Sequence, residues 1–205
     1  MAEEHIFFKS GRLKIEALTD IKSGEQAVIM CHPHPLYGGD MYNPVVDAVI
    51  EAFSVKGYST LRFNFRGGGS SEGEYGNGIG EQEDVLSAIE YLAGLGKSHI
   101  DLGGYSFGAW VCASGLKNWP QVKRLVMVSP PLAFMSFDFL EFDPRIRLII
   151  GADRDDIGPV NIISGMLKTW NPDVIFKIIN NSDHFYAGKK ADIQRIVEEF
   201  LSGNI

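Results

Sequence analysis

The stretch Gly104-Tyr105-Ser106-Phe107-Gly108 has the pattern Gly-x-Ser-x-Gly and lies where an apolar run, residues 99–103, passes into a segment of helical periodicity. In a strand-to-helix turn of this kind the serine hydroxyl is lifted clear of the sheet, and the two glycines let neighbouring backbone pass closely. The Phe107 amide lies at the start of the helix, where it can stabilise a developing oxyanion. The pattern predicts that Ser106 is a nucleophile. A glycine-rich turn without catalytic consequence is the alternative.

Outward from this turn, short apolar runs alternate with helical patterns along the chain. The expected strands are residues 5–9, 13–18, 26–32, 59–65, 99–103, 122–129, 145–151 and 174–179. The expected helices follow residues 45–53, an acidic start at residues 81–84, the Ser106 turn as far as residue 117, residues 159–170 and residues 193–201. Such alternation predicts an α/β fold with a mostly parallel central sheet and helices on both faces. No linker or repeat interrupts it, so we expect a single domain over residues 1–205.

A serine nucleophile needs a base, and in this architecture the chain order is serine, then an acid, then histidine. His184 is the one histidine of five that follows Ser106, and it lies in the loop after the last expected strand. Ligands of parallel sheets gather beyond the carboxyl ends of the strands, so a base is expected there. We therefore predict that His184 is the base; a surface loop histidine is the alternative.

The acid is expected in the loop after residues 145–151, which holds three aspartates: Asp153, Asp155 and Asp156. One of them would accept the Nδ1 proton of His184 and fix its tautomer. Asp156 could instead cap the helix that starts near residue 159, and Asp153 could pair with its neighbour Arg154. Spacing alone leaves all three open.

Composition and charge exclude several classes of function. The chain has 205 residues, of which 45% are hydrophobic and 22% charged, with a formal net charge of −7. This acidic balance argues against nucleic-acid binding, which requires clustered Lys and Arg, and against an anionic membrane surface. The longest apolar runs are five residues, whereas a membrane-spanning helix needs about 20. We expect neither a nucleic-acid partner nor a membrane span.

The cysteines and the N-terminal sequence favour a reducing compartment. Cys31 and Cys112 both lie in apolar stretches and form no disulfide framework, so we expect buried free thiols. The first residues are acidic and lack the apolar stretch of a secretory signal. A cytoplasmic protein is expected.

The pair His32 and His34 lacks an acidic or cysteine partner at the spacing of metal ligands. We therefore expect these histidines to shape the turn and anchor the loop rather than to bind a metal.

Taken together, the motifs resemble the α/β-hydrolase superfamily, in particular small bacterial serine hydrolases of the dienelactone-hydrolase-like and acyl esterase type. The blocks that carry the resemblance are residues 31–41 (Cys-His-Pro-His-Pro-Leu-Tyr-Gly-Gly-Asp-Met), residues 61–73 (Leu-Arg-Phe-Asn-Phe-Arg-Gly-Gly-Gly-Ser-Ser-Glu-Gly), the Ser106 turn, the Asp155 loop and residues 183–185 (Asp-His-Phe). They follow the family's order and span most of the chain. The resemblance implies Ser106 as nucleophile and His184 as base.

The resemblance also favours Asp155 as the acid, because Asp155-Asp156-Ile157-Gly158-Pro159 is similar to the family's D-[DE]-[IV]-V-P stretch. Two features differ from the family's pattern. Gly158 stands where valine is common, and the spacing from Gly151 to Asp155 is one residue longer than usual. The family's oxyanion hole implies the Phe107 amide and an amide of the loop at residues 34–37. Proline has no N–H, so the Leu36 amide is the expected second donor to the oxyanion, and the Tyr37 amide is the alternative. Serine rather than cysteine at the turn is typical of the esterases.

The resulting hypothesis is a serine hydrolase that cleaves a carboxylic ester (EC 3.1.1) through an acyl-enzyme, without metal or organic cofactor. Thioesterase and aminopeptidase or amidase activities remain alternatives, as does a non-catalytic binding protein of the same fold. The expected partner is a small acyl compound; whether the chain forms a homo-oligomer is left open. The aromatic residues expected near the site indicate an apolar substrate group, although they could equally be core: Tyr37, Tyr42, Phe107, Phe134 and Phe185.

A lid domain is not expected. The connection between the strands at residues 122–129 and 145–151 spans only residues 129–144, and it contains a Pro-Pro pair and little helical pattern. Residues 134–142 could form a short flap. The hydrolase core should therefore have an open site.

Overall fold

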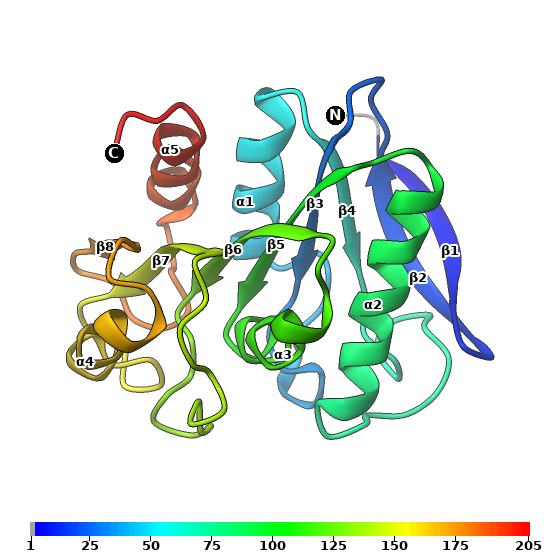
Figure 1. The fold of residues 1–205 in the computed structure, drawn as a ribbon. Coiled ribbons are helices and arrows are strands. Elements are labelled where there is room, and N and C mark those ends of the chain that lie inside the picture. The colour runs from blue at the N-terminus through cyan, green and yellow to red at the C-terminus, as the bar shows by residue number, and fades with distance from the viewer. Residues whose placement is uncertain (1–2) are drawn as a thin grey trace.

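The computed structural model describes residues 3–205 and is centred on one eight-stranded sheet (Figure 1). The strands are β1 (Glu4–Ser10), β2 (Leu13–Asp20), β3 (Gln26–Cys31), β4 (Ser59–Phe63), β5 (His99–Tyr105), β6 (Val122–Val128), β7 (Ile146–Ala152) and β8 (Ile175–Ile179). Their order in the sheet is β1-β2-β4-β3-β5-β6-β7-β8. The pairs β1–β2 and β2–β4 are antiparallel and the other five are parallel. The predicted fold class is confirmed.

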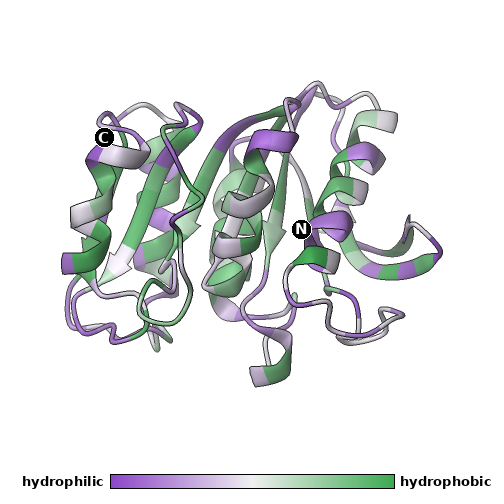
Figure 2. Cartoon of the chain, turned by 60° about the horizontal axis from the view of Figure 1, so that its bottom comes forward, coloured by the Kyte–Doolittle hydropathy of each residue, from purple (hydrophilic) through white to green (hydrophobic). Residues whose placement is uncertain are grey.

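Helices cover both faces of the sheet and bury a hydrophobic core on each side. The helices are α1 (Pro44–Val55), α2 (Ile79–Gly94), α3 (Phe107–Gly115), α4 (Val160–Trp170) and α5 (Lys190–Leu201). Helices α1 and α5 pack together over one face, and α2, α3 and α4 cover the other. The central strands β3 to β7 are largely buried and hydrophobic (Figure 2), as parallel strands covered on both faces must be.

The chain reverses its winding direction between β3 and β5. After β3 it passes through α1 to β4 on one side, whereas β5 pairs with β3 on the other side and leads into α3 on the opposite face. The loops that leave β3 and β5 therefore diverge at the carboxyl edge of the sheet. A crevice between such loops is where open α/β sheets bind ligands.

Two predicted element boundaries shift for identifiable reasons. The strand expected over residues 59–65 ends at Phe63, because the amide of Phe65 donates to Nε2 of buried His32 at 3.0 Å instead of continuing the ladder. The acidic helix expected from residue 81 begins at Ile79. Its Glu81 carboxylate accepts the amides of Gly76 and Gly78 at 2.8 and 2.7 Å. Both boundaries are set by hydrogen bonds between a side chain and a backbone amide. The apolar periodicity of the sequence does not reveal such bonds.

The connection from β6 to β7 carries no lid. Phe137 is buried against Trp170 of α4, with ring centroids 5.4 Å apart. The backbone oxygen of Ser136 accepts the indole N–H of Trp110 at 2.8 Å. The segment expected as a flap is thus packed onto α3 and α4, and only part of it faces the carboxyl edge.

The described part of the chain, residues 3–205, contains no helix that is both long and apolar enough to cross a membrane. Cys31 on β3 and Cys112 on α3 are both buried free thiols, as predicted. Burial raises the pKa of the Cys31 thiol well above its ordinary value. The Cys31 thiol is therefore not a reactive thiolate at neutral pH.

Candidate active site

Ser106 occupies a strained turn between β5 and α3. Its φ of 54° and ψ of −118° lie in a region that side chains other than glycine rarely adopt. The turn is held because the Ser106 amide donates to the Val128 carbonyl at 2.9 Å. A Cβ atom on Gly104 would lie 2.5 Å from the Ala109 nitrogen, and one on Gly108 would lie 2.4 Å from the Cys31 oxygen. Both glycines are therefore required by close backbone contacts, as the pattern indicates.

His184 reaches Ser106 from the loop after β8. Its Nε2 lies 2.9 Å from the Ser106 hydroxyl oxygen, and both side chains are largely buried. The loop is held in place by a hydrogen bond to β5, in which the hydroxyl of Tyr105 donates to the His184 carbonyl at 2.7 Å. The histidine expected from chain order is thus brought within hydrogen-bond distance of the expected nucleophile.

Asp155 is the aspartate of the three candidates that contacts His184. Its two carboxylate oxygens lie 3.0 and 2.9 Å from Nδ1. Asp153 instead accepts the amide of Ser182 at 3.0 Å, which ties the two loops together, and Asp156 is exposed. Helix α4 has no side-chain cap, so Asp156 is not its cap either.

The Asp155 carboxylate is surrounded by hydrogen-bond donors. Oδ1 accepts the amides of Ile157 and Gly158 at 2.8 and 2.7 Å, and Oδ2 accepts the hydroxyl of Ser129 at 2.6 Å. Burial alone would raise the pKa of this carboxyl group. The hydrogen bonds from His184, Gly158 and Ser129 outweigh burial, so the pKa lies below its ordinary value. The group is an anion at neutral pH.

Ser129 and Tyr186 complete this network, and sequence reasoning missed both. The Ser129 hydroxyl donates to Asp155, and the Tyr186 hydroxyl lies 2.7 Å from the Ser129 oxygen, where it can donate in turn. Ser129 and Tyr186 have φ values of 43° and 54°, an uncommon conformation for residues with side chains. The available signal for Ser129 was its position as a polar residue directly after β6, the strand next to the one that leads to Asp155. The left-handed backbone of Ser129 and Tyr186 leaves no signal in the sequence.

The backbone amides near Ser106 include the predicted oxyanion donors, Leu36 and Tyr37, and both make hydrogen bonds within their own loop. The Leu36 amide donates to Nδ1 of His34 at 3.3 Å, and the Tyr37 amide donates to the His34 carbonyl at 3.1 Å. Both predicted donors are therefore engaged inside a short 3₁₀ helix, Pro35–Tyr37, and Leu36 does not line the cleft. Within residues 3–205, the amides of Phe107 and His34 have no acceptor, and both residues line the cleft beside Ser106. Of the predicted loop, residues 34–37, His34 rather than Leu36 or Tyr37 thus has an unpaired amide beside the cleft.

The two histidines of the loop after β3 shape it. His32 is fully buried and its pKa is lowered to about 4 by burial, so the neutral ring donates from Nδ1 to the Pro33 carbonyl and accepts from the Phe65 amide. The ring of His34 stacks near that of Phe107, with centroids 4.6 Å apart. Burial also lowers the pKa of His34. Across residues 3–205 no group of His, Cys, Asp or Glu has the arrangement of a metal site.

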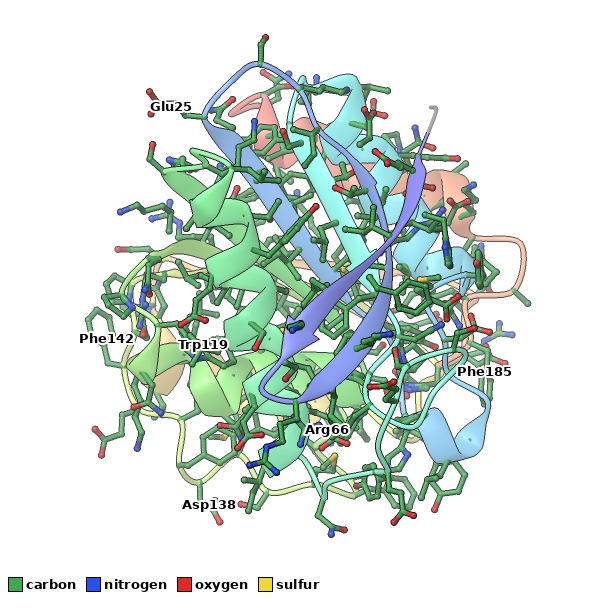
Figure 3. The ribbon with its side chains drawn as sticks, turned by 90° about the vertical axis from the view of Figure 1, so that its right-hand side faces the viewer. Glu25, Arg66, Trp119, Asp138, Phe142 and Phe185 are labelled. Carbon is green, nitrogen blue, oxygen red and sulfur yellow. The ribbon has the colours of Figure 1, made fainter. Side chains whose placement is uncertain are left out.

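An open cleft of about 800 Å³ lies over Ser106. It is lined by Pro33, His34, Tyr37, Gly38, Gly39, Asn43, Tyr105, Ser106, Phe107, Pro131, Phe134, Met135, Ile157, His184 and Phe185. Of the five aromatic residues expected near the site, Tyr42 does not line it. Figure 3 shows Phe185 and Asp138 in the lower half of the view, opposite Glu25, which precedes β3. The cleft is thus at the carboxyl edge of the sheet.

The chain has a relative among known proteins. No protein-family model matches the chain. An uncharacterized protein of Rickettsia prowazekii is 32% identical over 184 residues, which cover 84% of this chain and 77% of that protein.

Solved structures extend the likeness to the whole fold. An α/β serine hydrolase homologue from Coxiella burnetii is 30% identical with a TM-score of 0.90, covering 98% of both chains. A serine hydrolase without a lid from Xanthomonas campestris is 24% identical with a TM-score of 0.89, covering 98% of this chain and 94% of its own. The order of the strands, the strained serine turn and these relationships together place the chain in the α/β-hydrolase superfamily.

Proposed function

We propose that the protein is a serine hydrolase that cleaves carboxylic esters through an acyl-enzyme formed on Ser106. One observation carries the proposal: Ser106, His184 and Asp155 form a continuous, largely buried chain, with 2.9 Å between Oγ and Nε2 and 2.9 Å between Nδ1 and the nearer carboxylate oxygen. These are hydrogen-bond distances suited to general-base activation of a hydroxyl.

The first half of the reaction forms the acyl-enzyme. His184 takes the proton of Ser106 as the hydroxyl oxygen attacks the ester carbon, and the resulting imidazolium is stabilised by the Asp155 carboxylate. The tetrahedral intermediate collapses when the bond to the alcohol oxygen breaks, and His184 gives its proton to that leaving group. In the second half water attacks the acyl carbon and gives a proton to His184. The bond between the acyl carbon and Ser106 Oγ then breaks, His184 returns the proton to Oγ, and the carboxylic acid leaves.

The tetrahedral oxyanion would be stabilised by the free amides of Phe107 and His34. Each carries an N–H that the described protein leaves without an acceptor, and the two residues lie side by side, with ring centroids 4.6 Å apart. Preorganised backbone donors of this kind each contribute roughly 10²–10³ in rate. The steps require no metal or organic cofactor.

The proposal is tested by covalent labelling together with ester hydrolysis. The folded protein should react with a fluorophosphonate at Ser106 and hydrolyse 4-nitrophenyl butyrate. Ser106→Ala should lose the label and at least about 10⁴-fold in kcat/KM. The control is Ser70→Ala, which removes the hydroxyl of an exposed loop serine and should leave both readouts unchanged. A folded protein that takes no label at Ser106, or an alanine variant that keeps its activity, would overturn the proposal.

A further inference from the structure

Among residues 3–205, no Asp, Glu, Lys or Arg side chain lines the cleft over Ser106. Among residues within two positions of a lining residue, every charged one is an aspartate: Asp40, Asp155, Asp156 and Asp183. No lysine or arginine stands in these segments. The segments that form the cleft wall therefore carry acidic but no basic side chains, in a chain whose formal net charge is −7.

Several neutral polar side chains of the cleft already make hydrogen bonds within the protein. Asn43 accepts the Val45 amide at 2.9 Å, and the Tyr105 hydroxyl donates to the His184 carbonyl at 2.7 Å. The ring nitrogens of His34 bond the Leu36 amide and, at 3.2 Å, the Tyr75 hydroxyl. Within residues 3–205, the side-chain amide N–H groups of Asn43 and the hydroxyl of Tyr37 donate to no acceptor, so the cleft offers an anionic group of a substrate neutral donors but no cationic side chain.

Three aromatic side chains in the cleft are not part of the protein's core. The exposed fractions of Tyr37, Phe134 and Phe185 are 87%, 75% and 71%. They come from three different segments of the cleft wall. Tyr37 packs beside His34 with ring centroids 4.8 Å apart, and Phe185 stands edge-on to His184 at 5.8 Å. The apolar surface thus flanks Ser106 on its oxyanion side and on its base side, and clustered exposed apolar surface typically marks a ligand site.

We infer that the substrate is an uncharged ester with an aromatic or alkyl group, and that the cleft selects against anionic acyl compounds such as carboxylate-bearing esters and acyl-coenzyme A thioesters. The inference rests on the proposed function and names the substrate class of the same site. Binding buries apolar surface of the substrate against Tyr37, Phe134 and Phe185. An anion in the same place loses hydration, meets no cation, and is repelled by the Asp155 carboxylate and the neighbouring aspartates.

A matched pair of esters tests this selection. 4-Nitrophenyl butyrate and 4-nitrophenyl hemisuccinate share a leaving group and a four-carbon acyl chain, and they differ in a terminal methyl against a terminal carboxylate. We expect kcat/KM for the butyrate to exceed that for the hemisuccinate by at least about 30-fold at pH 7.5 and low salt, with a smaller ratio at high salt.

A charge introduced into the wall provides the reciprocal test. Phe134 is exposed, so its replacement leaves the core intact. Phe134→Lys should lower the butyrate-to-hemisuccinate ratio by about tenfold, whereas Phe134→Gln, which removes the ring without adding charge, should change the ratio less than threefold. Lower butyrate activity in both variants is expected from the lost apolar contact.

The possible failures are distinguishable. Equal kcat/KM for the two esters, or a ratio that Phe134→Lys and Phe134→Gln change alike, overturns the inference on substrate class. Labelling of Ser106 by fluorophosphonate without hydrolysis of either ester also overturns it. A folded protein that neither takes the label nor hydrolyses an ester refutes the proposed function itself.

Discussion

Replacing Ser129 by alanine removes one hydroxyl from beneath the Asp155 carboxylate. In the structure this hydroxyl donates to Oδ2 at 2.6 Å, within the short range of charge-assisted hydrogen bonds, and Ser129 is fully buried. A hydrogen bond to a charged group contributes about 1.5–3 kcal/mol. The Tyr186 hydroxyl also loses its partner, since its nearest remaining acceptor, the Ile150 carbonyl, lies 3.5 Å away. That loss adds about 1 kcal/mol.

The two contributions depend differently on pH. The pKa of Asp155 is lower in the folded protein than its ordinary value of 3.8, so the ionised carboxylate favours the folded state. This stabilisation is complete above about pH 5 and is lost as the pH falls through the folded pKa. Ser129→Ala raises that pKa and leaves less stabilisation to lose. The variant should therefore be less stable than the parent by about 2.5–4 kcal/mol at pH 7, and by a smaller amount at pH 3.

Urea unfolding at the two pH values measures the difference. Ser114→Ala serves as the control, because its hydroxyl donates at 2.8 Å to an uncharged group, the Trp110 carbonyl, one helical turn away. Its effect on the free energy of unfolding should be the same at both pH values. If the loss in Ser129→Ala is also independent of pH, the hydroxyl does not stabilise the charge on Asp155 and the reasoning is wrong.

Three further predictions follow from the geometry. Ser106→Gly should be more stable than Ser106→Ala by about 1 kcal/mol, because glycine relieves the strain of the turn, and thermal unfolding of the two variants will compare them. Gly108→Ala should lose activity and several kcal/mol of stability, because its Cβ would lie 2.4 Å from the Cys31 backbone oxygen; a folded, active variant would contradict the required contact. Burial lowers the pKa of His32 to about 4 from an ordinary 6.5, so the unfolded chain binds this proton first as the pH falls. The free energy of unfolding should drop by roughly 3 kcal/mol between pH 7 and pH 4, and this part of the slope should vanish in His32→Gln in the same urea titration.

The sequence predicted the fold because apolar periodicity and the order of elements largely determine a sheet buried on both faces. The same order pointed to Ser106 and His184, which the structure brings together at 2.9 Å. It did not separate Asp153, Asp155 and Asp156, because the choice depends on how the β7 loop turns. There the Arg154 amide is tied to the Ser182 carbonyl at 2.9 Å, a contact between distant segments.

The loop after β3 shows a second limit of sequence reasoning. Because proline has no N–H, the sequence pointed to Leu36 as the second oxyanion donor. It could not show which of the remaining backbone amides already had hydrogen-bond acceptors. The His34 side chain caps the 3₁₀ helix and uses the Leu36 amide, so the unpaired N–H is that of His34 itself. Ser129 and Tyr186 escaped notice for a related reason, since a left-handed backbone at a residue other than glycine has no signature in composition or periodicity.

The absence of a lid has a consequence for the fate of an acyl group held on Ser106. In residues 3–205 no segment closes over the cleft, so in the proposed reaction bulk water would reach the acyl carbon throughout its lifetime. Competition between water and an added alcohol is then set by their concentrations in the medium and by their nucleophilicity. The protein should consequently be a poor catalyst of transesterification in dilute alcohol, with ester synthesis rising only as water is withdrawn from the solvent.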